Sequence, residues 1–187
     1  SFTSKKNTLA TIYIIRDPRN LVNSISNHFS KSVEDSKNFL FAPKIITKFE
    51  KEDDLDNGSL ITLLGTWNEH YNFWKNNNEN FLLIKYEDLI NNTNSELDKI
   101  IAFIKRFTPI QTDEIKNKNI IKTTSFNYLQ NLEEKGGFDE NAYDTNDTKK
   151  KFFNLGPKNN WENNLNKKIK DEIELKFYVE MKELGYL

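Results

Sequence analysis

The pattern of hydrophobic and polar positions opens with an apolar run that changes abruptly into a helical repeat. Leu9–Ile15 is short, apolar and rich in β-branched residues, which predicts a strand covered on both faces. Asp17 and Pro18 then provide an N-cap oxygen and a first helical residue whose φ is already set. Apolar residues follow at helical spacing, at Val22, Ile25 and Phe29. The pattern predicts a strand, a tight turn and a helix, with Arg16 at the carboxyl end of the strand.

Later stretches continue this alternation. Ser59–Asn78 carries apolar residues at three- and four-residue steps, which predicts a helix capped by Ser59. Phe81–Tyr86 predicts a second buried strand. Thr93–Phe107 predicts an amphipathic helix that begins with a capping box of Thr93 and Glu96. Its predicted buried stripe consists of Leu97, Ile100, Ile101, Ile104 and Phe107.

Two further helices and two loops complete the pattern. Thr112–Ile121 predicts a short helix, and Leu165–Tyr186 predicts a terminal helix that ends with Gly185 as its C′ residue. The buried face of the terminal helix is expected to contain Ile169, Ile173, Phe177, Met181 and Leu184. Ser30–Gly58 and Glu133–Lys151 are polar and aperiodic, so we expect loops, the first as a lid or gate.

Composition narrows the classes of function. A chain of 187 residues predicts one domain, and a net charge of −1 provides no general attraction to nucleic acid or anionic membranes, so an anion site must be local. With no cysteine and two histidines, we expect no thiolate chemistry and no metal site. The absence of a long apolar run and of a signal region predicts a soluble cytoplasmic protein. Because the chain enters a strand almost at once and has no initial methionine, we expect an N-terminal portion to be missing.

Arg16 and Ser24 are the candidate anion ligands. Ser24 lies seven residues after Asp17, two helical turns along nearly the same face, so its hydroxyl and the Arg16 guanidinium could converge on one anion. Arginine suits phosphate because its planar donors bind two oxygens at once. The alternative is a structural Arg16, paired with Asp17 or a helix carbonyl, beside an exposed Ser24. Spacing alone leaves both interpretations open.

The segment YIIRDPRNLVNS resembles the 3′-phosphate-binding segment of the sulfotransferases that use PAPS (3′-phosphoadenosine 5′-phosphosulfate). That family shows an apolar strand, an Arg, a short corner with Pro, an apolar pair, and a Ser eight residues after the Arg. The resemblance implies that Arg16 and Ser24 bind the 3′-phosphate of the nucleotide.

Further segments match the family in the expected order. YEDL, which begins at Tyr86, resembles the end of a central strand of the family and implies that Tyr86 contacts the nucleotide. KTTSFNYL contains the Thr-Ser-Phe that lies beside the adenine in the family, so Thr124 is expected to bond the base and Phe126 to stack on it. The alternative for this segment is an ordinary helix start, capped by Thr124 or Ser125 with Phe126 buried.

Charged and aromatic residues near these segments receive structural interpretations. Glu87 and Asp88 are interpreted as caps of the turn after the strand that orient neighbouring basic groups, rather than as a catalytic pair. GTWNEHYNFW also resembles a family segment. Within it we interpret Trp67 and Trp74 as core anchors and His70 as a hydrogen-bonded core or boundary residue, rather than as a catalytic base.

The segment FFNLGPKNNW shows both a match and a departure. Gly156 aligns with a family glycine whose backbone approaches the phosphate. Asn154 and Leu155 stand where the family has the Arg and Lys that clasp the 3′-phosphate. Lys158, or Lys151, is the remaining candidate to supply that charge.

The resemblance implies an α/β, P-loop NTPase-like fold in which residues 1–187 form the C-terminal portion of a single sulfotransferase domain. It implies transfer of a sulfuryl group from PAPS to a hydroxyl or amine, with PAP (the desulfated nucleotide) as product and no metal. The family's 5′-phosphosulfate loop and base are expected upstream, so we expect no catalytic residue here and no activity from this chain alone. The implied acceptor is a small molecule, carbohydrate or lipid, and a homo-oligomer stays open.

Three other functions remain open at this stage. The first is a non-catalytic PAP- or PAPS-binding scaffold that kept the fold and lost the chemistry. The second is another P-loop-like kinase or NTPase. The third is a helical interaction protein without a ligand.

Overall fold

The structure is a computed structural model that describes residues 7–47, 61–138, 142–143 and 148–187. The first half contains β1 (Thr11–Ile15), α1 (Pro18–Phe29), α2 (Val33–Phe41), β2 (Lys44–Thr47), β3 (Ile61–Leu64), α3 (Trp67–Asn77) and β4 (Phe81–Lys85). The second half contains α4 (Tyr86–Asn91), α5 (Thr93–Ile104), α6 (Glu114–Thr123), α7 (Phe126–Glu134), β5 (Ala142–Tyr143), β6 (Lys149–Lys150), the 3₁₀ turn η2 (Gly156–Lys158), α8 (Trp161–Asn164), α9 (Lys167–Lys176) and α10 (Tyr178–Glu183).

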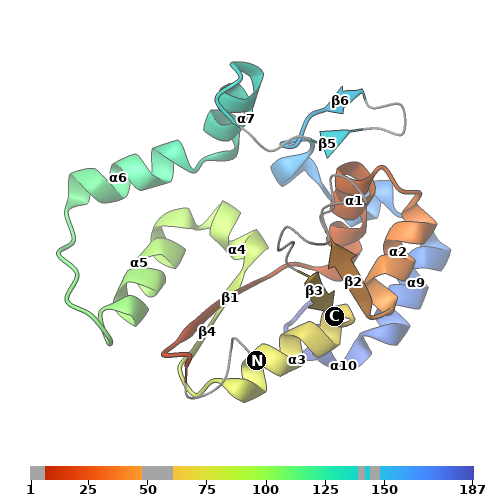
Figure 1. Ribbon diagram of the computed structural model, residues 1–187, viewed down its shortest axis with the longest axis horizontal. Helices are drawn as coiled ribbons and strands as arrows, with labels where there is room; N and C mark the ends of the chain where they lie inside the picture. Colours follow the sequence, from red (N-terminus) through yellow and green to blue (C-terminus); the bar gives the residue numbers. More distant parts are fainter. Residues whose placement is uncertain (1–6, 48–60, 139–141, 144–147) are drawn as a thin grey trace.

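A parallel pair of strands lies at the centre of the arrangement. β1 and β4 run side by side in the same direction, with Thr11 opposite Phe81 and Ile15 opposite Lys85. Helices α3 and α5 flank the pair (Figure 1), since α3 contacts β1 and α5 contacts β4. The predicted α/β fold with parallel strands flanked by helices is confirmed. Because both strands end at the same edge, Arg16 and Tyr86 follow them at neighbouring positions.

One prediction about β1 is wrong. Its side chains alternate: Ile15 is buried, whereas Ile12 and Ile14 are 39% and 53% exposed. Successive strand residues point to opposite faces, and within the described residues β1 pairs with β4 alone. The strand is therefore covered mainly on one face, not on both.

Helix α1 begins as predicted. The Asp17 side chain accepts a hydrogen bond from the Arg19 backbone N–H, and proline occupies the first helical position. Val22 and Ile25 are buried, but Phe29 is 40% exposed and packs against Phe39 of α2. The predicted stripe is therefore wrong at its last residue, because the final turn of α1 extends beyond the core.

The region expected to be a polar loop contains α2 and β2, so this prediction is wrong for the described residues. The proposed lid or gate falls partly on residues 48–58, which lie outside the described ranges. The predicted helix from Ser59 is also wrong in its first part: Ile61–Leu64 forms β3, which pairs antiparallel with β2. An apolar run of this length suits a strand as well as a helix. Ser59, its predicted cap, lies outside the described residues.

The start of α3 is instead set by a local hydrogen-bond exchange. The Thr66 hydroxyl accepts from the Glu69 backbone N–H, and the Glu69 carboxylate accepts from the Thr66 N–H. This capping box satisfies two of the backbone donors that a helix N-terminus leaves unpaired.

The predicted capping box of α5 is wrong. The Thr93 hydroxyl donates backwards to the Leu89 carbonyl, and Glu96 forms an ion pair with Lys99. Thr93 is unsuited to capping because α4 ends directly before it, so a helical carbonyl is already within reach. The predicted buried stripe is only partly buried, whereas Phe103, outside the stripe, is buried.

Three smaller differences concern the second half. The helix expected at Thr112–Ile121 is found as α6, capped by Asp113. The loop expected from Glu133 contains the end of α7 and the short pair of β5 and β6. The predicted terminal helix is divided into α9 and α10, which meet at Phe177.

The core lies where α1, α2 and α3 meet α9 and α10. All five residues predicted for the terminal face are buried, each with at most 4% of its surface exposed. They pack with residues of β1, α1, α2 and α3, namely Ile15, Val22, Ile25, Leu40, Trp67 and Tyr71. Gly185 has φ +70°, which confirms it as the left-handed residue after the last helix.

Candidate functional site

The structure brings Arg16 and Ser24 together. The Arg16 Nη1 donates to the Ser24 Oγ at 2.8 Å, and the guanidinium carbon lies 4.3 Å from the centre of the Tyr86 ring. The Arg16 Nε is buried and has no hydrogen-bond acceptor among the described residues. An unsatisfied buried donor on a cation is costly, so this geometry suits an incoming anion.

The electrostatics of Arg16 point the same way. Burial lowers the pKa of Arg16, and its electrostatic interactions with Tyr86, Glu87 and Asp17 partly oppose that effect. The guanidinium still carries its charge at neutral pH, because its ordinary pKa is far above 7. A partly desolvated cation with an open donor attracts an anion more strongly than a solvated surface arginine does.

A cavity of about 1090 Å³ opens in front of this pair. Its walls come from α1, α4, α5, α6, α7 and the segment from Phe152 to Pro157. Of the described residues that line it, Arg16 is the only one with a full charge, and most of the others are apolar. A concave, mostly apolar cavity with a few convergent polar groups is the usual form of a small-molecule site.

Phe126 and Gly156 form a close contact on the cavity wall. A Cβ added to Gly156 would lie 2.2 Å from the Cε2 of Phe126, and Gly156 has φ +50°. Both the space and the backbone conformation therefore require glycine. The Phe126 ring also meets the edge of Phe153, whose backbone N–H is held by the Glu133 carboxylate. The aromatic wall is thus anchored from two directions.

The start of α7 confirms the helix cap and is compatible with the predicted base contact, which stays a prediction, whereas Phe126 is half-buried rather than buried. Ser125 is the N-cap and accepts from the Tyr128 N–H, so the helix-start alternative is confirmed for this residue. The Thr124 hydroxyl donates to the Ile120 carbonyl at 2.7 Å. Thr124, Ser125 and Phe126 nevertheless all line the cavity. A helix cap and a ligand contact are therefore compatible at this position.

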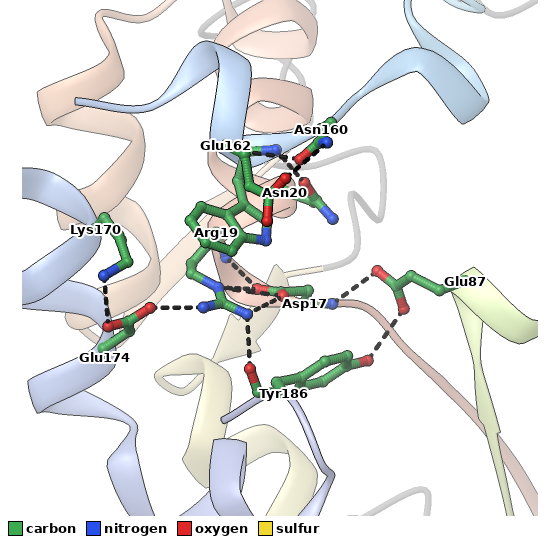
Figure 2. A network of polar contacts seen from close by, with 10 residues as sticks. Asp17, Arg19, Asn20, Glu87, Asn160, Glu162, Lys170, Glu174 and Tyr186 are labelled. Carbon is green, nitrogen blue, oxygen red and sulfur yellow. Dashed lines mark hydrogen bonds and ion pairs between the residues drawn. The ribbon is translucent and has the colours of Figure 1, made fainter. Parts of the chain in front are cut away.

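Arg19, the neighbouring arginine, has a different environment (Figure 2). Its guanidinium binds Asp17 and Glu174 and donates to the Tyr186 carbonyl at 2.8 Å. Burial lowers the pKa of Arg19, but its bonds to the two carboxylates outweigh burial and raise it. The stacked Trp161 ring lies 4.0 Å away. Arg19 is saturated by protein groups and joins the start of α1 to the terminal helices, whereas Arg16 keeps open donors.

Glu87 has a structural role, but not as the cap expected of it, because the start of α4 has no side-chain capping hydrogen bond. Its carboxylate accepts from the Asp17 backbone N–H at 3.1 Å and from the Tyr186 hydroxyl at 3.1 Å (Figure 2). It therefore links the end of β4 to the corner after β1, and it helps to position Arg16, which lies in that corner.

Known proteins resemble this chain in sequence. Residues 2–185 match the family described as the sulfotransferase domain. This chain belongs to the sulfotransferase family. A 3-alpha-hydroxysteroid sulfotransferase of Cavia porcellus is 32% identical over 136 residues, which are 71% of this chain and 42% of that protein. The cytosolic sulfotransferase 12 of Arabidopsis thaliana is 26% identical over 176 residues, or 91% of this chain and 49% of that protein. The chain spans about half the length of these sulfotransferases.

A solved sulfotransferase has a similar fold. The crystal structure of mouse sulfotransferase SULT7A1 complexed with PAP aligns with this chain with a TM-score of 0.63 at 19% sequence identity. The alignment covers 95% of this chain and 59% of the mouse chain. At this identity the likeness concerns the fold. In the described part of this sulfotransferase chain, no helix is long and apolar enough to cross a membrane. No group of three or more possible metal ligands was found among the described residues.

Some of the remaining predicted site residues line the cavity and others do not. Tyr86 and Gly156 line it with Arg16 and Ser24, but Lys158 lies outside its lining and is exposed. Lys151 forms a surface ion pair with Glu134 at 2.6 Å. Neither lysine therefore lies in the cavity lining, where a cation would have to replace the Arg and Lys of the family.

His70 lies away from the cavity lining and matches the boundary role expected of it. The Tyr13 hydroxyl is 2.7 Å from the His70 Nδ1, and burial lowers the pKa of this histidine. Trp67, on the same helix, is buried in the core as expected.

Sequence reasoning missed a group of asparagines on the cavity side of α1. Asn20, Asn23 and Asn27 recur at helical spacing and bind the segment from Lys151 to Trp161 through side-chain hydrogen bonds. Asn159, from that segment, hydrogen-bonds to α1. The spacing of the α1 asparagines was visible in the sequence, but asparagine is so frequent in this chain that the signal did not stand out.

Proposed function

We propose that the protein containing this chain is a PAPS-dependent sulfotransferase and that residues 1–187 are the C-terminal portion of its catalytic domain. On this proposal the chain holds the 3′-phosphoadenosine part of the nucleotide. The observation that carries the proposal is the Arg16–Ser24 pair at the cavity, with the Arg16 Nε buried and without an acceptor among the residues that the structure describes. Family membership and the PAP bound in the mouse neighbour support it.

The predicted site residues would have the following roles. Arg16 and Ser24 would bind the 3′-phosphate, the first through charge-assisted hydrogen bonds. Phe126 would stack on the adenine, Thr124 would face the base edge, and Tyr86 would support the Arg16 guanidinium beside the ribose. The Gly156 backbone would approach the phosphate where a side chain has no room. Lys158, exposed outside the lining, would contribute at most long-range attraction.

When bound, PAPS supplies the sulfuryl group that is transferred to a hydroxyl or amine of the acceptor. Within this chain we assign binding and orientation only, and no catalytic residue. The base and the 5′-phosphosulfate loop belong, on this proposal, to a portion of the domain outside residues 1–187. The isolated chain should then bind nucleotide weakly and catalyse no transfer.

The acceptor and the location are proposed more broadly. The guinea-pig relative is named for a hydroxysteroid, which supports a small-molecule acceptor with a hydroxyl group. The Arabidopsis relative is named as cytosolic, which supports a cytoplasmic enzyme.

Calorimetric titration of the complete protein that contains this chain with PAP tests the proposal. Arg16→Ala should weaken PAP binding by about 2 kcal/mol or more, about 30-fold, because a charge-assisted contact is lost. Arg106→Ala is the matched control, since Arg106 is exposed and lies outside the cavity lining. Equal affinities of wild type and Arg16→Ala, or no PAP binding by the wild type, would refute the assignment.

A further inference from the structure

Asn159 is a largely buried amide beside Ser24, and it also contributes to the cavity lining. It is 8% exposed and lies between η2 and α8, where the chain returns to α1. Its Nδ2 donates to the Asn20 carbonyl at 2.8 Å and to the Ser24 Oγ at 3.3 Å. Its Oδ1 accepts from the Asn23 Nδ2 at 3.2 Å.

These partners determine the orientation of the amide. The Asn20 carbonyl is an acceptor only, so it requires the Asn159 NH₂ group on its side. The opposite orientation would place the Asn159 oxygen against that carbonyl oxygen and would leave the Asn23 donor facing another NH₂. The amide therefore directs one of its two hydrogens at Ser24.

The hydrogen-bond capacity of Ser24 is then nearly filled. A serine hydroxyl has two acceptor lone pairs and one hydrogen. Arg16 Nη1 and Asn159 Nδ2 occupy the two lone pairs. Within the described ranges the Ser24 hydrogen has no hydrogen-bond acceptor, and Ser24 lines the cavity. The hydroxyl is thus prepared to donate its hydrogen to a group in the cavity.

We propose that Asn159 is a positioning residue of the anion site: it occupies the second lone pair of Ser24 and so commits the Ser24 hydroxyl to donate to the ligand's phosphate. This inference rests on the proposed function, because it takes the anion to be the 3′-phosphate. It also explains how a site with one cation among its described lining residues compensates for the Asn154 and Leu155 departure. Asn159 donates to Ser24, and Ser24 in turn donates to the phosphate. These two neutral hydrogen bonds stand in for the charged contacts that the Arg and Lys of the family make with the phosphate.

The experiment is a double-mutant cycle read by calorimetry with two nucleotides. PAP carries the 3′-phosphate, and AMP (adenosine 5′-monophosphate) lacks it. Asn159→Ala should weaken PAP binding by about fivefold, the scale of one neutral hydrogen bond, and should leave AMP binding unchanged. In the Ser24→Ala background, Asn159→Ala should cost less than about twofold, because the group through which it acts is absent.

Two further variants control for folding. Asn160→Ala makes the same substitution at the adjacent asparagine, which caps α8 outside the cavity lining, and should leave PAP binding unchanged. If Asn159→Ala does not fold, Asn159→Asp keeps the volume of the side chain. Its carboxylate would accept the Ser24 hydrogen, so PAP binding should fall more than tenfold, and this loss should also shrink in the Ser24→Ala background.

The outcomes separate the two proposals. PAP binding by the wild type, with equal losses from Asn159→Ala in both backgrounds or equal losses for PAP and AMP, overturns the inference and leaves the proposed function standing. No PAP binding by the wild type overturns the proposed function, and the inference with it. A loss confined to PAP and dependent on Ser24 supports the inference.

Discussion

Replacing Gly156 with alanine should disturb the cavity wall at one defined point. The added Cβ would lie 2.2, 2.4 and 2.5 Å from three atoms of the Phe126 ring, well inside contact distance. The ring is rigid and Phe153 restricts it from another side, so either the ring or the Gly156 segment must move. The variant therefore tests whether this contact shapes the nucleotide site.

The magnitude follows from two terms. An alanine with φ near +50° costs about 1–2 kcal/mol. Displacing a packed side chain costs about a further 1–3 kcal/mol. Gly156→Ala should thus lower the free energy of unfolding by about 2–5 kcal/mol. PAP binding should weaken as well, because Phe126 leaves the position proposed for adenine stacking.

Gly136 provides the matched control. It also has positive φ, +75°, but an added Cβ would meet no atom within 4 Å. Gly136→Ala should therefore show the backbone term alone, about 1–2 kcal/mol, with PAP binding unchanged. Urea unfolding measures the first quantity and calorimetry the second. In a Phe126→Ala background, the cost of Gly156→Ala should fall to that of Gly136→Ala. Equal costs for the two glycine variants in the wild-type background would refute the reasoning.

Two further predictions concern stability. Arg19→Ala should lower the free energy of unfolding by about 3–5 kcal/mol in urea unfolding, because it leaves the buried Asp17 carboxylate without its cation. The His70 pKa is lowered in the fold, so between that value and about 6.5 the unfolded chain binds more protons. Stability should then decrease as pH falls from 7 to 5, and His70→Gln should reduce that decrease when unfolding is measured at both pH values.

An exposed ion pair serves as the control for Arg19→Ala. Lys118→Ala breaks an exposed pair with Glu114 and should change the free energy of unfolding by less than about 0.5 kcal/mol. A similarly small effect of Arg19→Ala would show that the buried network in Figure 2 is unimportant for stability. An unchanged slope in His70→Gln would contradict the proposed role of His70 burial.

Local signals predicted much of the fold. The Asp17–Pro18 helix start and the buried face of the terminal helices depend on residues within a few turns of each other, where side-chain chemistry and periodicity act directly. β3 was missed for the same reason. Its apolar residues Leu63 and Leu64 also fit a helical period, and only pairing with β2, across an intervening segment, makes this stretch a strand.

In the candidate site, too, local contacts could be expected from the sequence and long-range contacts could not. The spacing of Arg16 and Ser24 allowed them to converge, because both lie on one strand–turn–helix unit, but it left a structural Arg16 equally open until the structure showed their hydrogen bond. No spacing could place Lys158 outside the cavity or bring Asn159 to Ser24, 135 residues away in sequence. Such contacts depend on how η2 and α8 return to α1.

The sequence by itself determined parts of this protein that short-range chemistry controls: the Asp17–Pro18 helix start, the buried face of the terminal helices, and an arginine and a serine that a single turn places near each other. The tertiary structure decided which of two adjacent arginines keeps open donors. Arg19 is saturated because the terminal helices deliver Glu174 and the Tyr186 carbonyl to it, whereas Arg16 receives Ser24 and Tyr86 and retains a buried, unpaired Nε. Glu174, Tyr186 and Tyr86 come from elements far from α1 in the chain, so only packing could give the two adjacent arginines such different environments.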